Sequence, residues 1–169
     1  MMKTSMRKLG AYFNTHRMVQ EYTERFYLPA HRAGVRLAMD GFASARQLSA
    51  WRSRVATAWS RVSMRVDGGK PAGDLLVGSR VPVAIRADLG TLTPDDVTVE
   101  VYYGILDTAG QVRNGETILA RHEGREGNED VFRAEIPCRV SGRFGFAARI
   151  VPRHPDLVNP LTPLLLTWE

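Results

Sequence analysis

The chain has 169 residues, of which 44% are hydrophobic and 24% are charged, a composition typical of a globular protein with one domain or two small ones. Its single cysteine cannot form an internal disulfide, and no apolar run approaches the ~20 residues that a membrane span needs. We therefore expect a cytoplasmic protein that has no membrane partner.

Charge is distributed unevenly along the chain. Residues 1–66 carry a net charge of +9, whereas residues 67–169 carry −4. A basic half is a feature of nucleic-acid-binding proteins, but the arginines here are spread through a helical pattern and form no basic block. We expect a solvated face or an acidic neighbour, and no nucleic-acid partner.

Residues 1–66 are predicted to be a helical segment. Asn14 is a plausible helix N-cap, and Met18, Tyr22 and Phe26 then recur every four residues as one apolar packing face. Pro29 is expected to end or kink this helix at Leu28.

A second, longer helix is expected to follow, although two glycines in its first turns leave its start uncertain. Its apolar stripe comprises Val35, Ala38, Phe42, Ala45, Leu48, Trp51 or Arg52, Val55 and Trp59. Residues 67–74, DGGKPAGD, are predicted to be a linker, because the spacing of a phosphate-binding loop is absent.

Residues 75–169 change to a two-residue period. Val81, Val83, Ile85, Ala87 and Leu89 alternate with other residues, and further short runs follow at 97–103, 117–122, 131–136, 143–151 and 164–168. Turn signals separate these runs. The predicted fold class is α+β, with a helical segment followed by an antiparallel, immunoglobulin-like β-sandwich. We expect this sandwich to fold alone.

No recognisable catalytic or metal motif occurs in the sequence. Cys138 is more typical of a buried apolar position than of a reactive thiol, and the acidic residues that follow His122 indicate a solvated loop. Tyr102 and Tyr103 are adjacent in a predicted strand, so they face opposite sides. One is expected in the core, and the other could contact a sugar ring.

Residues 5–30, SMRKLGAYFNTHRMVQEYTERFYLPA, resemble the segment that follows the cofactor-binding domain in bacterial α-glucan (glycogen/maltodextrin) phosphorylases. The residues that carry the likeness are Ser5, Met6, Phe13, Asn14, Thr15, Arg17, Met18, Glu21 and Tyr22. The long helix with its two tryptophans and the stretch SGRFGFAARIVPRHPDL at 141–157 are also similar to the tail of these enzymes. The resemblance covers nearly the whole chain and most specifically its first part.

The resemblance implies a function for the longer enzyme. Such phosphorylases have two lobes in a GT-B arrangement and use pyridoxal phosphate while inorganic phosphate cleaves an α-1,4-glucan to glucose 1-phosphate. Their cofactor lysine and phosphate-binding residues lie upstream of the matched segment, so no catalytic or cofactor-binding residue maps onto this chain. Met1 or Met2 would be internal in such an enzyme, as in a fragment, a split gene or a mis-called start.

The resemblance therefore implies a non-catalytic C-terminal portion that is inactive alone. Its partners would be the missing catalytic lobes, with the Met18, Tyr22 and Phe26 face packed against them. The alternative is a free-standing interaction or carbohydrate-binding module, whose partner would be an α-glucan.

Overall fold

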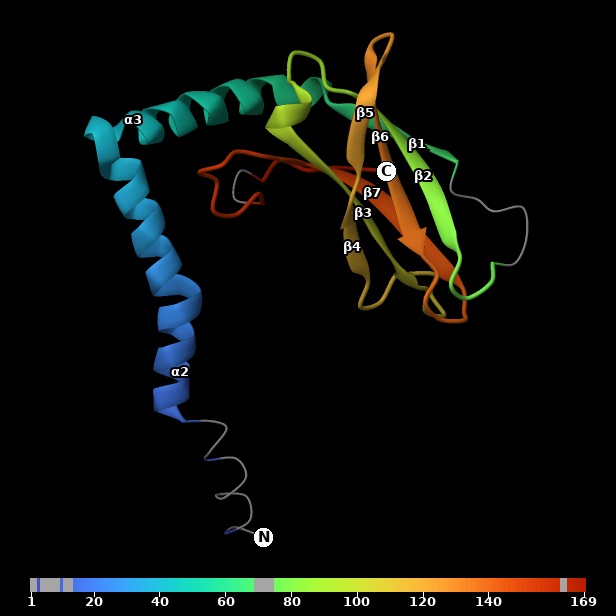
Figure 1. Ribbon diagram of the computed structural model, residues 1–169, viewed down its shortest axis with the longest axis horizontal. Helices are drawn as coiled ribbons and strands as arrows, with labels where there is room; N and C mark the ends of the chain where they lie inside the picture. The colour runs from blue at the N-terminus through green and yellow to red at the C-terminus, as the bar shows by residue number, and fades with distance from the viewer. Residues whose placement is uncertain (1–2, 4–9, 11–13, 69–74, 162–163) are drawn as a thin grey trace. The chain divides into compact units, whose positions relative to one another are not determined.

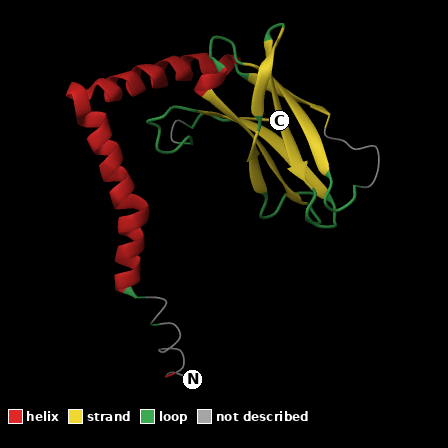
Figure 2. Ribbon diagram, viewed as in Figure 1, coloured by secondary structure: helices red, strands yellow, loops and turns green. Residues whose placement is uncertain are grey.

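The computed structural model describes residues 3, 10, 14–68, 75–161 and 164–169, which form two compact units (Figure 1). The first unit is Met1–Leu48 and the second is Ser49–Glu169. Helices dominate the first unit, and β-strands with the end of one helix make up the second (Figure 2). None of the described helices is both long enough and apolar enough to cross a membrane.

Helix α2, Thr15–Tyr22, begins where the sequence predicts. The side-chain oxygen of Asn14 accepts a hydrogen bond from the backbone N–H of Arg17 at 2.7 Å, which satisfies one of the unpaired donors of the first turn. Gln20 donates to Glu24 one turn further on, at 2.9 Å. The N-cap assignment of Asn14 is therefore confirmed.

Of the two outcomes expected for Pro29, an end or a kink at Leu28, the first is wrong, because the helix continues. A π-helical turn, η1, spans Thr23–Tyr27, and helix α3, Leu28–Ala58, continues through Pro29. A proline ring would clash with the carbonyl four residues earlier and offers no N–H to it. In the wider turn the Leu28 N–H bonds to the Thr23 carbonyl, five residues back, which is the register of a π-bulge.

Helix α3 is interrupted further along, at Met39–Phe42. Asp40, Gly41 and Phe42 have φ angles of 51°, 61° and 65°, so three successive residues are left-handed. Non-glycine residues adopt this conformation at a cost of about 1–2 kcal/mol each, and usually singly. The Arg46 guanidinium donates to the Gly41 carbonyl at 2.6 Å, which holds part of the turn.

Two four-stranded antiparallel sheets form the second unit (Figure 1). The first has the order β1-β2-β6-β5, with bounds Ser63–Gly68, Arg80–Asp88, Glu129–Pro137 and Arg121–Glu126. The second has the order β4-β3-β7-β8, with bounds Glu116–Leu119, Val97–Ile105, Phe144–Pro152 and Thr167–Trp168. Short 3₁₀ turns, η2 and η3, span Trp59–Arg61 and Pro94–Asp96. The α+β class is confirmed, and the immunoglobulin-like shape stays a prediction.

The core of the second unit follows the alternation seen in the sequence. In β2 from Val83 to Ala87 and in β3 from Val97 to Tyr103 every second side chain is buried, and β6 and β7 add further buried residues. The most deeply buried aliphatic side chains include Val83, Ile85, Val99, Val101 and Ile150. The end of α3 contributes Trp51, Val55 and Ala58 to the buried set, and Trp59 of η2 joins them.

The strand boundaries differ from the sequence-based expectation at the linker. Residues 63–66 were expected to be helical and 67–68 to be linker, but β1 covers Ser63–Gly68 and pairs along β2, with Val66 opposite Ile85. Only Met64 and Val66 alternate there, a run too short to reveal a strand period. The remainder of the expected linker, residues 69–74, lies outside the described residues.

We predict that a fragment of residues 49–169 unfolds in one cooperative transition, whereas residues 75–169 unfold at a clearly lower temperature. The shorter fragment lacks β1 and the buried side chains of Trp51, Val55 and Trp59. At ~1.5–3 kcal/mol for each buried side chain, this loss is comparable with the whole stability of a small domain. Calorimetry of both fragments checks it, and equal midpoints would exclude the helix end and β1 from the folding unit.

We also predict that Phe42→Gly stabilises the turn relative to Phe42→Ala. Both changes remove the ring, but glycine accepts a positive φ at little steric cost, whereas alanine pays ~1–2 kcal/mol. Hydrogen-exchange protection of the amides of residues 43–46 measures the difference. In an uninterrupted helix the order would reverse, because alanine is favoured over glycine there by ~1 kcal/mol.

Candidate interaction site

The predicted apolar row lies on α2 and η1, and its side chains are exposed. Met18, Tyr22 and Phe26 are 50%, 48% and 59% exposed. The rings of Tyr22 and Phe26 lie 5.6 Å apart between centroids, and Tyr27 stacks on Tyr22 at 6.4 Å.

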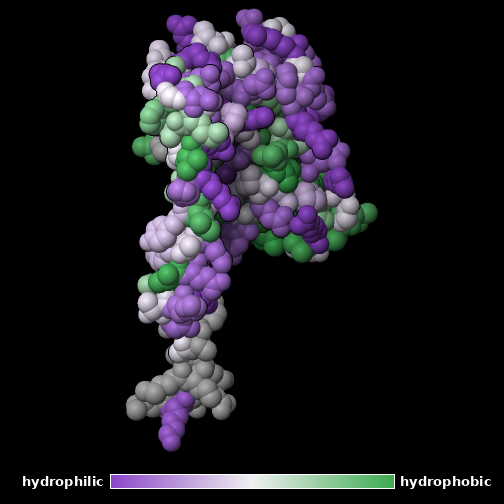
Figure 3. Space-filling model, turned by 60° about the vertical axis from the view of Figure 1, so that its left-hand side comes forward, coloured by the Kyte–Doolittle hydropathy of each residue, from purple (hydrophilic) through white to green (hydrophobic). Residues whose placement is uncertain are grey.

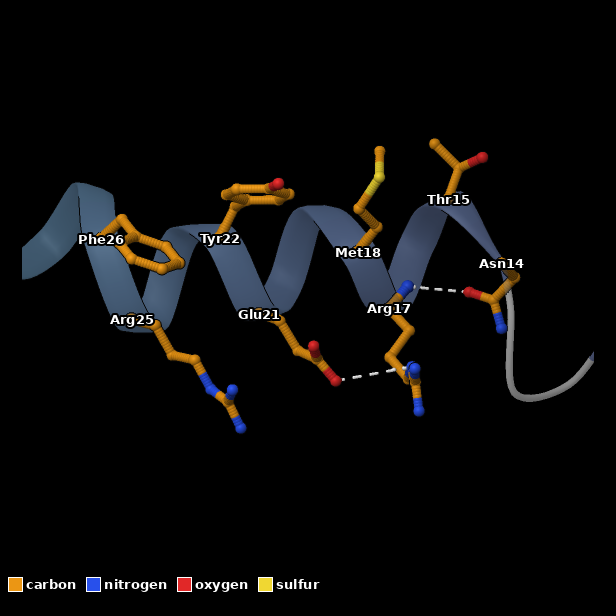
Figure 4. Close-up of a pocket in the computed structure, with 8 residues that line it drawn as sticks. All are labelled: Asn14, Thr15, Arg17, Met18, Glu21, Tyr22, Arg25 and Phe26. Carbon is orange, nitrogen blue, oxygen red and sulfur yellow. Dashed lines mark hydrogen bonds and ion pairs between the residues drawn. The ribbon is translucent and has the colours of Figure 1, made fainter. Parts of the chain in front are cut away.

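The same helix surface carries a groove with an apolar and a polar edge (Figure 4). Met18 and Tyr22 project from one edge, whereas Arg17, Glu21 and Arg25 project from the other. Arg17 and Glu21 form an ion pair at 3.5 Å, one turn apart. The remaining lining residues are Asn14, Thr15 and Phe26. This combination of an apolar row beside charged side chains suits contact with another macromolecule.

The described part of the first unit has almost no core of its own. Among its described residues with an assigned exposure, only Ala33 is buried. The exposed large apolar residues comprise Met18, Val19, Tyr22, Phe26, Tyr27, Leu28, Val35, Met39 and Phe42. Figure 3 shows hydrophobic side chains at the molecular surface among hydrophilic ones. Apolar surface of this extent is typical of interaction surfaces.

A buried polar cluster around Asp96 anchors the end of α3 within the second unit. The Asp96 carboxylate accepts hydrogen bonds from the Trp51 indole at 2.9 Å and from both terminal nitrogens of Arg54 at 2.6 and 3.0 Å. It also accepts from the backbone N–H and hydroxyl of Thr93, both at 2.9 Å. These bonds join the helix to the η3 turn, where Thr93 and Asp96 form a capping box.

The segment after β7 closes the same cluster. The Arg153 N–H donates to the Asp96 backbone carbonyl at 2.7 Å, and the His154 ring lies 4.9 Å from the Trp51 ring. Burial alone would raise the pKa of Asp96, but hydrogen bonds from Arg54, Thr93 and Trp51 outweigh it and hold that pKa well below its usual range. Asp96 is therefore a charged structural anchor at neutral pH.

The two tyrosines of β3 lie on opposite faces of the strand, as the sequence predicts. Tyr103 is 4% exposed and donates to Glu116 at 2.7 Å, so it is the core member of the pair. Tyr102 is half-buried, and its hydroxyl accepts a hydrogen bond from the Gly115 N–H at 3.1 Å. A sugar contact through Tyr102 stays a prediction, whereas the burial of Tyr103 excludes it from an exposed platform.

The other reactive side chains have structural neighbours. Cys138 is buried, and the acidic residues around His122 form ion pairs instead of a free acidic cluster: Glu123 with Arg133, Glu126 with Arg86 and Glu129 with Arg65. His122 itself lies 2.9 Å from Asp130. Over the described ranges no group of three or more His, Cys, Asp or Glu side chains could hold a metal ion.

Pyridoxal phosphate does not fit the residues described by the structure. The cofactor requires a lysine for its Schiff base and a partner for its ring nitrogen. Lys3 is the one lysine within the described positions, and it is exposed. No chemical step can therefore be assigned to this cofactor on the described residues.

Sequence reasoning identified the helical face but missed the Asp96 cluster. The available signal was the stretch TPDD at 93–96, which has the spacing of a capping box. By local pattern it is one of the turn signals between the predicted strands. Nothing in the sequence connects it to Trp51 and Arg54, more than forty residues earlier.

Comparison with known proteins agrees with the resemblance seen in the sequence. Residues 59–169 match the family described as glycogen phosphorylase C-terminal domain. Glycogen phosphorylases from Mycobacterium bovis and Mycobacterium tuberculosis are each 31% identical over 159 residues, covering 93% of this chain and 18% of the relative. Maltodextrin phosphorylase from Thermococcus litoralis is 27% identical over 178 residues, covering 100% of this chain and 20% of the relative. The chain thus spans about a fifth of the length of these relatives.

We predict that Asp96→Asn destabilises the second unit by about 2–3 kcal/mol at pH 7, the value of a hydrogen bond to a charged group plus the cost of an unpaired partner. Asp95→Asn is the matched control, because Asp95 is the exposed neighbour in the same turn and should change stability by less than ~0.5 kcal/mol. Urea unfolding of both variants measures the difference.

The stability lost in Asp96→Asn should also depend on pH. Because the folded pKa of Asp96 is lowered, its stabilisation is fully present above the unfolded pKa of ~3.9 and is lost as the pH falls toward the folded value. The stability gap between the native chain and Asp96→Asn should therefore narrow below about pH 4. A gap that stays constant from pH 7 to pH 3 would contradict the role of the charged carboxylate.

Proposed function

The chain belongs to the glycogen phosphorylase C-terminal domain family, and we propose that it acts as a non-catalytic brace, a part that packs against the catalytic lobes of an α-glucan phosphorylase and stabilises them. It corresponds to the C-terminal portion of glycogen and maltodextrin phosphorylases. The complete enzyme would bind pyridoxal phosphate in its other lobes and use inorganic phosphate to release glucose 1-phosphate from an α-1,4-glucan. The partner of this chain would be those catalytic lobes.

The observation that carries this proposal is the exposed apolar face of α2 and η1. Met18, Tyr22 and Phe26 are about half exposed or more, and neighbouring large apolar side chains are also exposed. A lone helical segment gains little stability in water, because most helical stability in proteins comes from packing an apolar face. A partner surface would supply that packing. The relatives are about five times longer than the matched region, so most of such an enzyme is available to provide it.

Burial of the exposed apolar face would supply enough free energy to dock this chain on a catalytic lobe. Burying a large apolar side chain stabilises by ~1.5–3 kcal/mol, so Met18, Tyr22 and Phe26 together would contribute several kcal/mol. The left-handed turn at Asp40–Phe42 supports the same interpretation, because strained backbone persists where surrounding contacts hold it. Met39 and Phe42 are 57% and 58% exposed beside that turn, and a docked lobe could cover both.

The two units would have different roles. Residues 1–48 would complete a GT-B type lobe, and residues 49–169 would form an accessory domain whose two sheets make an immunoglobulin-like sandwich. The second candidate function is a free-standing interaction or carbohydrate-binding module, favoured by the separate core of this second unit. The cytoplasm remains the expected location.

Fragment complementation tests the brace function. The Mycobacterium tuberculosis glycogen phosphorylase would be truncated at the start of its matched region and mixed with this chain. We expect glucose 1-phosphate release from maltodextrin to rise on mixing, while the chain alone produces none above blank. A truncated enzyme that is fully active without this chain, or inactive in its presence although the two bind, would oppose the proposal.

We predict that Tyr22→Ser with Phe26→Ser costs the isolated chain less than ~1 kcal/mol of stability and improves its solubility, because these side chains are already exposed. In a full-length phosphorylase the same pair should cost about 3–5 kcal/mol for each buried aromatic. Val55→Ser is the control, since Val55 is 0% exposed and its loss should destabilise the isolated chain. Thermal melts of the native chain, the double variant and Val55→Ser measure these losses of stability, and the double variant is melted in the full-length phosphorylase as well. If the double variant loses as much stability in the short chain as in the long one, the face is packed internally.

A further inference from the structure

The outer faces of the two sheets differ in chemistry. On β1-β2-β6-β5 the outward side chains form ion pairs between strands, with Arg65–Glu129 at 2.7 Å and Arg80–Glu135 at 2.9 Å among them. On β4-β3-β7-β8 the cross-strand pair between Glu100 and Arg149 lies among aromatic and uncharged residues. The first face is covered by charge, whereas the second presents rings and small side chains.

The strand register defines two adjacent rows on this second face. One row crosses all four strands and contains Leu119, Glu100, Arg149 and Trp168. The other row contains Thr117, Tyr102 and Ala147. Tyr102 and Trp168 are two strands apart, or roughly 10 Å across the sheet, at ~4.8 Å per strand. We call these seven residues the aromatic platform.

Trp168 has the most exposed ring of the platform, and its neighbours hold it in place. Its side chain is 47% exposed, and the Arg149 guanidinium lies 5.3 Å from its ring centroid in a cation–π contact. Arg149 is itself held by Glu100 at 2.6 Å, with both charged side chains mostly covered. The tryptophan is thus a pre-oriented ring beside one carboxylate and one guanidinium, which lowers the entropy cost of binding a ligand.

Tyr102 is a second fixed ring on the other side of Ala147. Its hydroxyl accepts from the Gly115 N–H, and a Cβ at Gly115 would lie 2.5 Å from the Tyr102 ring, so the ring packs directly on this glycine. The small side chain of Ala147 stands on the intervening strand β7, next to Tyr102. Two aromatic rings with fixed contacts therefore lie on either side of β7, with Glu100 and Arg149 beside them.

We propose that the aromatic platform binds a chain of α-linked glucose units as a surface site separate from the catalytic lobes. The C–H face of a sugar ring can stack on the electron-rich face of Trp168 or Tyr102. The sugar hydroxyls can donate to Glu100 and accept from Arg149. The inference rests on the proposed function, which makes an α-glucan the polymer that this protein meets. A bound polymer is held close to the enzyme, so its effective concentration there rises.

A protein occupant fits this surface less well than a glucan. In protein–protein interfaces, the residues that contribute most of the binding energy cluster together and are buried in fully desolvated pockets. Here the exposed apolar side chains of Leu119 and Trp168 are at opposite ends of one row, with an ion pair between them. Spaced rings with hydrogen-bonding groups in between match an extended, hydroxyl-rich chain.

The test is calorimetric titration of the intact 169-residue chain with maltoheptaose, with the β-linked cellohexaose as the comparison ligand. We expect maltoheptaose to bind more tightly than cellohexaose. Trp168→Ala should weaken maltoheptaose binding by roughly tenfold, equivalent to ~1.4 kcal/mol. Tyr102→Ala should also weaken maltoheptaose binding, because it removes the second ring of the platform. Tyr27→Ala, an exposed aromatic of the helical segment, is the matched control and should leave binding unchanged.

Three results would contradict the proposal that the aromatic platform binds a glucan. The first is absence of maltoheptaose binding at millimolar concentration, and the second is a Trp168→Ala variant that binds as well as the native chain. The third is loss of complementation with the truncated phosphorylase in Trp168→Ala while glucan binding persists, which would make this face a protein contact. Because Trp168 is exposed at the end of the chain, Trp168→Ala is expected to fold, and its melting curve checks that. Failure of glucan binding alone leaves the brace function intact, since complementation measures that function separately.

Discussion

The five hydrogen bonds to the Asp96 carboxylate hold together the parts of the second unit that are distant in sequence. Through them the end of α3 and the η3 turn before β3 meet at one buried charge, and the segment after β7 joins by the hydrogen bond from the Arg153 N–H to the Asp96 backbone carbonyl. A buried carboxylate without partners would be strongly destabilising, but here donors surround it and the cost of burial is offset. Arg54 keeps its side chain half exposed, so it can neutralise Asp96 without itself being fully desolvated. The helix end becomes part of the sheet domain because this carboxylate binds it.

The first unit has no comparable anchor among its described residues. Its local structure is well specified by the Asn14 cap and by hydrogen bonds and ion pairs one turn apart, but these are worth only tenths of a kcal/mol to about one each. Large apolar side chains remain at its surface. The chain therefore combines a unit that has its own core with a unit whose described residues bury almost no apolar side chain.

Much of this organisation could be predicted from the amino-acid sequence, for identifiable reasons. Asn14 and the row from Met18 to Phe26 depend on neighbours within two turns, so local pattern predicted them. The alternation in β2 and β3 likewise predicted the buried residues of these strands. Strand β1 was missed because two alternating residues beside a glycine-rich stretch give no usable period. The π-helical turn before Pro29 was missed because proline predicts a disturbance but not how the backbone accommodates it.

Local sequence patterns could not predict the contacts between residues that are distant in the sequence. The partners of Asp96 are separated from it by 42 and 45 residues, and the row that joins Glu100, Arg149 and Trp168 depends on the order of strands in a sheet. Tyr102 was identified from its position in a strand, but Trp168 was not, because its strand has two residues and its exposure depends on β7.

The distribution of aromatic residues has a consequence for spectroscopy. All three tryptophans, Trp51, Trp59 and Trp168, belong to the unit Ser49–Glu169. Tryptophan emission excited at its red edge therefore follows that unit alone, with two buried indoles and one exposed indole as reporters. The helical segment contributes only tyrosine signal, from Tyr22 and Tyr27 among its described residues. A single tryptophan placed at Val19, which is 53% exposed on α2, would add a reporter to the segment that is otherwise silent in tryptophan emission.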